Sequence, residues 1–329
     1  MIKRLSFIFV FACLLCGCYD HTDIEDIKNV ALIIADTNKI SYCTITTEPE
    51  EKSYGYKVYN VATDDLYYGL NSIGEQTGKE VSLSHLEAIM FSKECDYQTV
   101  KKTINSLLEG TNSHPKIMTA FLDGDSAMFF DRLNIPADTS VNKLISNVFY
   151  NRFESTIECS AMDLSCAINF DVAGKAVPVV FADEEGNINS TESVFVNNYG
   201  FASLDMNTTQ FLNAIDSKEV YINYNNINVP VECQNIKFTL SQNSIDCDAV
   251  LKIRSGSDST TKQVVSDFVK AVTDDIIFKK NEGFDLLNMQ GKIVKEFRDI
   301  PSFEKYIQKN GGVKNWLKNI NLNIEIGVK

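Results

Sequence analysis

Residues 15–18, with the sequence Leu-Cys-Gly-Cys, constrain this chain most, because they end a short apolar segment with the pattern of a bacterial lipobox. Two basic residues precede the apolar run 5–15, and this run is well short of the ~20 residues that a membrane-spanning helix needs. The pattern therefore predicts that residues 1–17 are a lipoprotein signal peptide, which is removed after export. Only the residues that follow can contribute to the fold.

Cleavage is expected between Gly17 and Cys18, and Cys18 is the expected site of lipid attachment. Gly17 is small and a branched apolar residue stands three positions before the cysteine, as lipoprotein signal peptidase requires. Two or more acyl chains anchor a protein stably, whereas one holds it only marginally. Residues 18–26 then form a lipidated acidic tether that reaches at most ~28 Å. The alternative is an ordinary secretory signal with a chance cysteine.

The mature chain is acidic, and this limits its partners. The formal net charge is -13, and removal of the leader takes away two positive charges and no negative ones. Acidic surfaces do not bind nucleic acid or anionic headgroups by themselves, so we expect no nucleic-acid partner. Membrane association must then come from the lipid or from a protein. The hydrophobic content of 44% argues against disorder, and the length suffices for two or three domains.

The first part of the mature chain interleaves strand-like and helix-like segments, which predicts a mixed α/β domain. Runs rich in β-branched residues indicate strands, and turn residues at 36–39 predict a hairpin. Expected strands cover 30–35, 40–47, 56–61, 81–91, 117–122 and 176–182. Expected helices cover 66–73, 100–108, 126–133, 141–150 and 159–170. Asp64 or Asp65 is expected to cap the first of these helices, and Asp125 the helix at 126–133.

The polar stretch 183–190 is the expected boundary between an N-terminal domain, 27–188, and a C-terminal domain, 189–329. The second domain should contain several strands, a bulge near Gln234, a long amphipathic helix and a final alternating strand. Expected segments are 193–204, a helix at 208–215, strands at 231–240 and 245–253, helices at 260–280 and within 284–320, and a strand at 322–328. We therefore predict an α+β fold, with largely antiparallel sheets flanked by helices.

The sequence offers no catalytic or metal-binding motif. None of the three histidines, His21, His85 and His114, shares a cluster with cysteine or carboxylates at metal spacing. There is also no Gly-x-Ser-x-Gly elbow, P-loop or dinucleotide-binding glycine motif. We therefore expect a protein that is not an enzyme and that has no cofactor and no metal.

Six cysteines remain beyond Cys18, and we expect them to be mostly free, buried thiols. Cys247 illustrates this, because it stands on the apolar side of a regular alternation and behaves there as a small hydrophobic residue. Disulfides stay the alternative, since the chain is exported and the count is even. The six are Cys43, Cys95, Cys159, Cys166, Cys233 and Cys247.

Four segments carry a family resemblance through their order. Residues 18–26 place an aromatic residue and an aspartate after the lipidated cysteine and then an Ile-Glu pair, and 81–89 form a Leu-x-His-Leu-like strand. Residues 199–202 give a glycine and apolar opening, and Trp316 precedes the alternating strand 322–328. Together these segments resemble the Ger(x)C family of spore germination lipoproteins over most of the chain.

The chain departs from this family pattern at Asp285. The family commonly has an aspartate followed by a glycine-aromatic-glycine cluster after the long helix, whereas Asp285 precedes Leu286-Leu287-Asn288-Met289. We therefore expect a helix to continue through this turn. His85 is expected to be packed in a strand and to have no functional role.

The resemblance implies a noncatalytic receptor subunit. Family members are the third subunit of nutrient germinant receptors, so the expected partners are the integral membrane A-type and B-type subunits, besides the membrane itself through the lipid anchor. The implied location is the outer face of the spore inner membrane. The alternative function is a solute-binding lipoprotein of a transporter, although the hairpin-rich pattern is not typical of that class.

Overall fold

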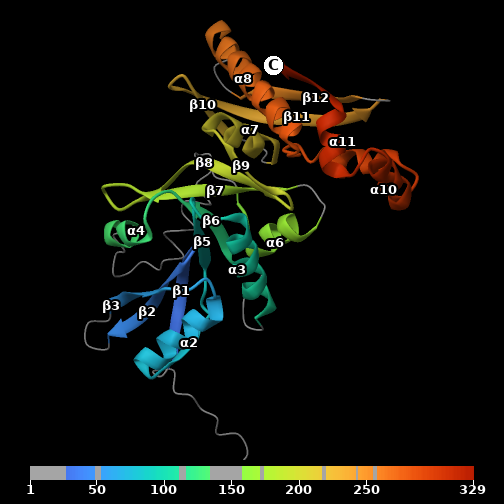
Figure 1. Cartoon of the computed structure of the whole chain (residues 1–329). Coiled ribbons are helices and arrows are strands. Elements are labelled where there is room, and N and C mark those ends of the chain that lie inside the picture. The colour runs from blue at the N-terminus through green and yellow to red at the C-terminus, as the bar shows by residue number, and fades with distance from the viewer. Residues whose placement is uncertain are drawn as a thin grey trace, which may run out of the picture.

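The structure is a computed structural model, and it contains two β-sheets flanked by helices (Figure 1). It describes residues 27–48, 53–110, 116–133, 158–170, 174–216, 220–241, 244–254 and 258–329. The expected helix 141–150 lies outside these residues, as do the leader 1–17 and the tether 18–26.

The first sheet has nine strands in the order β3-β2-β1-β5-β6-β7-β8-β9, and β4 pairs with β1. Its strands are β1 (Ile27–Asp36), β2 (Lys39–Glu48), β3 (Ser53–Val61), β4 (Glu80–Ser82), β5 (Ala88–Ser92), β6 (Met118–Leu122), β7 (Lys175–Ala182), β8 (Ile188–Asn197) and β9 (Gly200–Leu204). The central strands β1, β5, β6 and β7 are parallel, and hairpins add antiparallel strands at both edges.

Helices cover both faces of this sheet, because its central strands are apolar on both sides. α2 (Leu66–Thr77), α3 (Tyr97–Glu109) and α6 (Ala161–Asn169) pack on one face, and α4 (Ser126–Arg132) packs on the other (Figure 1). A β-bulge in β1 places Ala31 and Leu32 on the same side, so that both face the α4 core. Of the two predicted candidates, Asp65 rather than Asp64 caps α2, and Asp125 caps α4 as predicted.

The second sheet has the order β10-β11-β12-β13 and carries helices on one face. Its elements are α7 (Met206–Asp216), β10 (Val220–Tyr224), β11 (Ile227–Leu240), β12 (Ser244–Ile253), α8 (Ser259–Glu282), α9 (Met289–Ile293), the 3-10 helix η2 (Val294–Glu296), α10 (Ile300–Lys309), α11 (Val313–Asn319) and β13 (Asn321–Val328). The apolar stripe of α8, including Val265 and Phe268, enters the same core as the inner side of β12. The final strand β13 pairs in parallel with β12.

The predicted α+β fold class is confirmed. Six of the eleven strand pairings among the described residues are antiparallel, which makes the sheets largely antiparallel. The register of β11 against β12 shifts between Gln234 and Lys237, so the predicted bulge is also confirmed. Strand β10 was not predicted. It is joined to β11 by Asn225 and Asn226, which both have positive φ as a two-residue hairpin turn requires.

Two local predictions are wrong. The segment 81–91 is not one strand, because a turn at 84–85 separates β4 from β5 and exposes His85. The polar stretch 183–190 is not a linker, because 183–187 turn the chain from β7 into β8. The expected boundary after residue 188 therefore falls inside a hairpin of the first sheet, which continues to Leu204.

Gly69 in α2 gives a test of the packing on the first sheet. A Cβ atom at Gly69 would lie 2.0 Å from the hydroxyl of Tyr42, which is buried and donates a 2.8 Å bond to the carbonyl of Leu66. We expect Gly69→Ala to lower the free energy of unfolding by about 2 kcal/mol or more, through overpacking or loss of this bond. Gly74→Ala in the same helix should change it by less than about 1 kcal/mol. Urea unfolding followed by circular dichroism measures both, and equal losses would contradict the packing described.

Candidate functional site

The predicted modification residues Gly17 and Cys18 lie outside the described residues, so cleavage and lipid attachment there stay predictions. The prediction for His85 is wrong, because its side chain is exposed at a turn and is not packed in a strand. Within the described ranges, no three side chains of the histidine, cysteine or acidic type are grouped closely enough to hold a metal ion. Likewise, none of the helices in those ranges combines the length and apolar character needed to cross a membrane.

The six cysteines beyond Cys18 are all free thiols, as predicted. Burial raises the pKa of four of them to about 12, so these thiols stay protonated and unreactive at neutral pH. These four are Cys43, Cys95, Cys159 and Cys247, while Cys166 and Cys233 are partly buried. The four buried cysteines therefore contribute packing to the cores.

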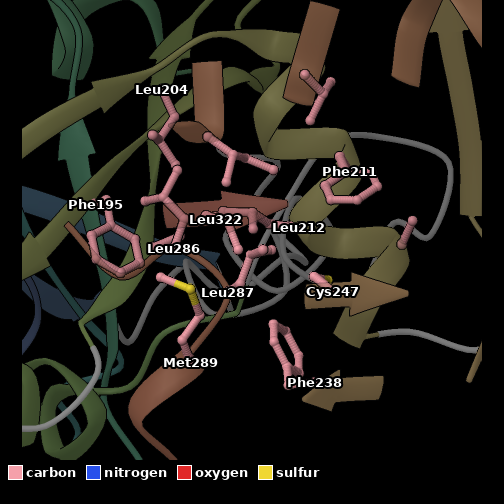
Figure 2. Close-up of a cluster of buried hydrophobic side chains, with 14 of the residues drawn as sticks. Phe195, Leu204, Phe211, Leu212, Phe238, Cys247, Leu286, Leu287, Met289 and Leu322 are labelled. Atoms are coloured by element: carbon pink, nitrogen blue, oxygen red, sulfur yellow. The ribbon is translucent and has the colours of Figure 1, made fainter. Parts of the chain in front are cut away.

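The candidate site is the junction where the first sheet meets the helices of the second. Phe195 of β8 and Leu204 of β9 belong to the same apolar core as Leu286, Leu287 and the β13 side (Figure 2). Side chains from both halves of the chain therefore share one hydrophobic core. The two halves are joined by apolar packing as well as by the chain.

Contacts at the end of α8 fix this junction. The rings of Phe195 and Phe284 meet edge to face, with centroids 6.3 Å apart. The side-chain amide of Asn197 donates a 3.4 Å bond to the carbonyl of Gly283. The buried ammonium of Lys280 donates to the carbonyl of Ile320, and its burial lowers the pKa of that lysine.

A cavity of about 220 Å³ lies at this junction. Its wall is largely apolar, and its ionisable side chains are both lysines. The lining residues are Gly174, Lys175, Ala176, Phe195, Leu212, Ile215, Leu286, Leu287, Asn288 and Lys292. They include no carboxylate, histidine or cysteine, so the lysine ammonium groups are the ionisable groups that this lining offers. Its chemistry suits noncovalent contact with a small apolar or anionic group.

Asp285 sets the shape of the segment that lines the cavity. Its carboxylate is 2% exposed and accepts the backbone N–H groups of Met289 at 2.7 Å and Gln290 at 2.9 Å. Desolvation by burial raises the pKa of Asp285 to about 6, although the two N–H bonds lower it. The carboxylate thus holds the start of α9 in place.

The expected continuous helix through this segment is wrong. α8 ends at Glu282 and is capped by Gly283, whose φ of 101° is left-handed, and α9 starts only at Met289. Asn288 also has a positive φ, 53°, and its side chain accepts the N–H of Gly291 at 3.0 Å. The turn between the two helices carries Leu286 and Leu287 into the junction. Hydrophobic periodicity alone did not reveal this break.

The cavity was not predicted from the sequence. Its lining comes from three separated stretches, 174–176 with 195, 212–215 and 286–292, which only the folded chain brings together. The one local signal was the departure from the family pattern after Asp285, which marks the segment that lines the cavity.

Comparison with known proteins identifies one similar fold. A crystal structure of the GerBC protein matches with a TM-score of 0.53 over 94% of this chain and 99% of that chain, at 13% sequence identity. The sequence matches no protein-family model and no curated protein. At this identity the likeness shows the fold, and the fold of this chain is GerBC-like across both sheets.

The buried Asp285 predicts a pH dependence of stability. Its pKa is raised from 3.8 to about 6, so the folded chain retains a proton that the unfolded chain releases between these values. The contribution to stability is complete below pH 3.8 and is lost as the pH rises to about 6, by up to about 3 kcal/mol. Asp285→Asn should remove this decline in the free energy of unfolding, which urea unfolding at a series of pH values measures.

The matched control is Asp299→Asn at the exposed start of α10. Asp299 accepts the N–H of Ser302, which lowers its pKa, and asparagine is an equally good capping residue. This variant should keep the decline between pH 4 and 6. Retention of the same decline in Asp285→Asn would show that other groups cause it.

Proposed function

We propose that this chain is the noncatalytic C subunit of a nutrient germinant receptor, anchored by a lipid on Cys18 to the outer face of the spore inner membrane. The observation that carries the proposal is the GerBC-like fold, which spans nearly all of both chains. The ordered segments that resemble Ger(x)C proteins support it independently, because they were identified from residues alone.

The subunit acts by docking. It transmits or supports a nutrient signal through contact with the integral membrane A-type and B-type subunits, while the lipid keeps it beside them. The junction supports this role, since its shared core makes the two halves one body that can pass a force from one surface to another.

The alternative is a solute-binding lipoprotein, and the cavity at the junction is the observation in its favour. Such a protein closes two lobes around its ligand, so the lobes must separate easily. Here Phe195 and Phe284 pack in one core across the junction, which opposes that motion. A thermal-shift screen with amino acids, sugars and nucleosides distinguishes the two functions. Ligand-dependent stabilisation that grows with concentration would favour solute binding.

Replacement of the lipidated cysteine tests the anchoring. Cys18→Ala should move the protein from the membrane fraction of spores to the soluble fraction and should impair nutrient-triggered germination, because no acyl chain is attached. Cys166→Ala, which alters a partly buried thiol in α6, should leave both unchanged. Cell fractionation and the loss of optical density after nutrient addition measure the two effects. Normal germination with a fully soluble variant would contradict the proposal.

Partner capture tests the docking. The intact chain, purified with mild detergent from the spores that produce it, should bring down two multispanning membrane proteins, and deletion of the chain should abolish the response to at least one nutrient. Cys18→Ala should reduce this capture, since the anchor raises the local concentration of the partners. Absence of multispanning partners together with unchanged germination after deletion would refute the proposed function.

A further inference from the structure

The charge of this chain is strongly segregated. Residues 289–320, here called the basic module, contain seven lysine or arginine side chains and three acidic ones, whereas the other residues contain 24 basic and 41 acidic. The module is therefore +4 and the remainder is -17, although the net charge of the chain is -13. The module comprises α9, η2, α10 and α11, which lie together at one end of the second sheet (Figure 1).

All seven basic side chains of the module are exposed. In the described part of the chain, none of them lies within ion-pair distance of a carboxylate, whereas Lys93, Lys102, Arg254 and Lys279 elsewhere do form ion pairs. The seven are Lys292, Lys295, Arg298, Lys305, Lys309, Lys314 and Lys318. Their charges are thus not compensated by ion pairs, although Lys292 also lines the cavity and the ammonium of Lys314 lies 5.5 Å from the ring centroid of Tyr199.

A rigid aromatic core holds these side chains in place. Phe297 contacts Phe303 and Tyr306 with ring centroids 5.3 and 5.2 Å apart, and the indole N–H of Trp316 donates to the Tyr306 hydroxyl at 3.2 Å. Trp316 is only 1% exposed. Phe297, Phe303 and Tyr306 are partly buried, so the outer surface of the module is formed largely by the seven cations, three acidic residues and Ile300, which is 63% exposed.

We propose that the basic module binds the anionic surface of a lipid bilayer. The side chains are spaced to act together, since Lys305 and Lys309 lie one turn apart on α10, and Lys314 and Lys318 lie one turn apart on α11. Clusters of this size are attracted to anionic headgroups within about one Debye length, about 8 Å. Exposed Ile300 adds an apolar contact at the start of α10.

The composition of the module favours a membrane over an acidic protein surface. Six of its seven cations are lysines. Lysine is depleted at protein–protein interfaces, where arginine and aromatic side chains are enriched. A flexible ammonium suits a mobile headgroup layer, which has no fixed geometry to match. The aromatic side chains of the module pack against one another, and Trp316 among them is buried.

Charge segregation also orients the chain on such a surface. An anionic bilayer attracts the module and repels the acidic remainder. The attraction and the repulsion both favour the orientation in which the module faces the bilayer. The overall charge alone indicated that anionic headgroups would not bind, because it averages over the module and the acidic remainder. The proposal requires only a membrane and does not depend on the receptor function.

Vesicle binding tests the proposal with the full chain from residue 18, carrying Cys18→Ser so that no acyl chain contributes. The probes are phosphatidylcholine vesicles with and without about a quarter phosphatidylglycerol. We expect partitioning at least about tenfold stronger with phosphatidylglycerol, falling as salt rises from about 0.05 to about 0.5 M. Equal partitioning to both vesicles, or none to either, would overturn the proposal and leave an acidic protein as the partner.

Matched charge reversals locate the binding. Lys305→Glu with Lys309→Glu on α10 should reduce partitioning to the anionic vesicles by about tenfold or more, because charges of the attractive surface are inverted. Lys262→Glu with Lys270→Glu, at exposed positions of α8, gives the same change of net charge and should reduce it less than about twofold. Equal losses would show that net charge and not the module decides binding.

A second module variant guards against a folding defect. Lys314→Gln with Lys318→Gln neutralises two cations on α11 without adding new repulsion, and it should lower partitioning in the same direction. Thermal unfolding of each variant confirms that the fold is intact. Full binding by both module variants would refute the assignment of the surface to the module.

Discussion

The apolar contact between the first sheet and the turn after α8 is the constraint on which the rest of the structure depends. Phe195 and Leu204 from the first sheet are buried in the same core as Leu286 and Leu287 from the second half, so the two halves share this core. Burial of large apolar side chains is the dominant favourable term in folding. The cavity lies at this contact, and Asp285 holds the segment that carries Leu286 and Leu287 into it.

Local chemistry made much of the fold predictable. Helix caps such as Asp65 and Asp125, the long amphipathic stripe of α8 and the bulge near Gln234 each depend on residues close in sequence. The stretch 183–190 shows the limit of this approach. Its turn residues were correctly identified, but the same residues serve a linker and a hairpin equally well. Only pairing with a distant strand decides between the two.

The site was far less predictable than the fold. A cavity lined by segments from both halves leaves no periodic signal, and a buried carboxylate such as Asp285 looks like a solvated one until its surroundings are known. The spacing of apolar residues also gave a wrong prediction at the α8–α9 turn. The apolar residues there favour a helix by their spacing, but in the structure they fill the junction. The break there depends on Gly283 and Asn288, whose left-handed backbone ends one helix and starts another.

The parallel pairing of β12 with β13 has a consequence for folding kinetics. A hydrogen bond such as that from Asn323 to Asp246 spans 77 positions, and α8, α9, α10 and α11 lie between its ends. Contacts of such long range are slow to form, because a large loop must close before they stabilise the chain. Until β13 pairs with β12, the edge of β12 has unpaired backbone N–H and C=O groups, which can pair with strands of other chains. A chain exported in an unfolded state would therefore be exposed to aggregation for the whole of this interval.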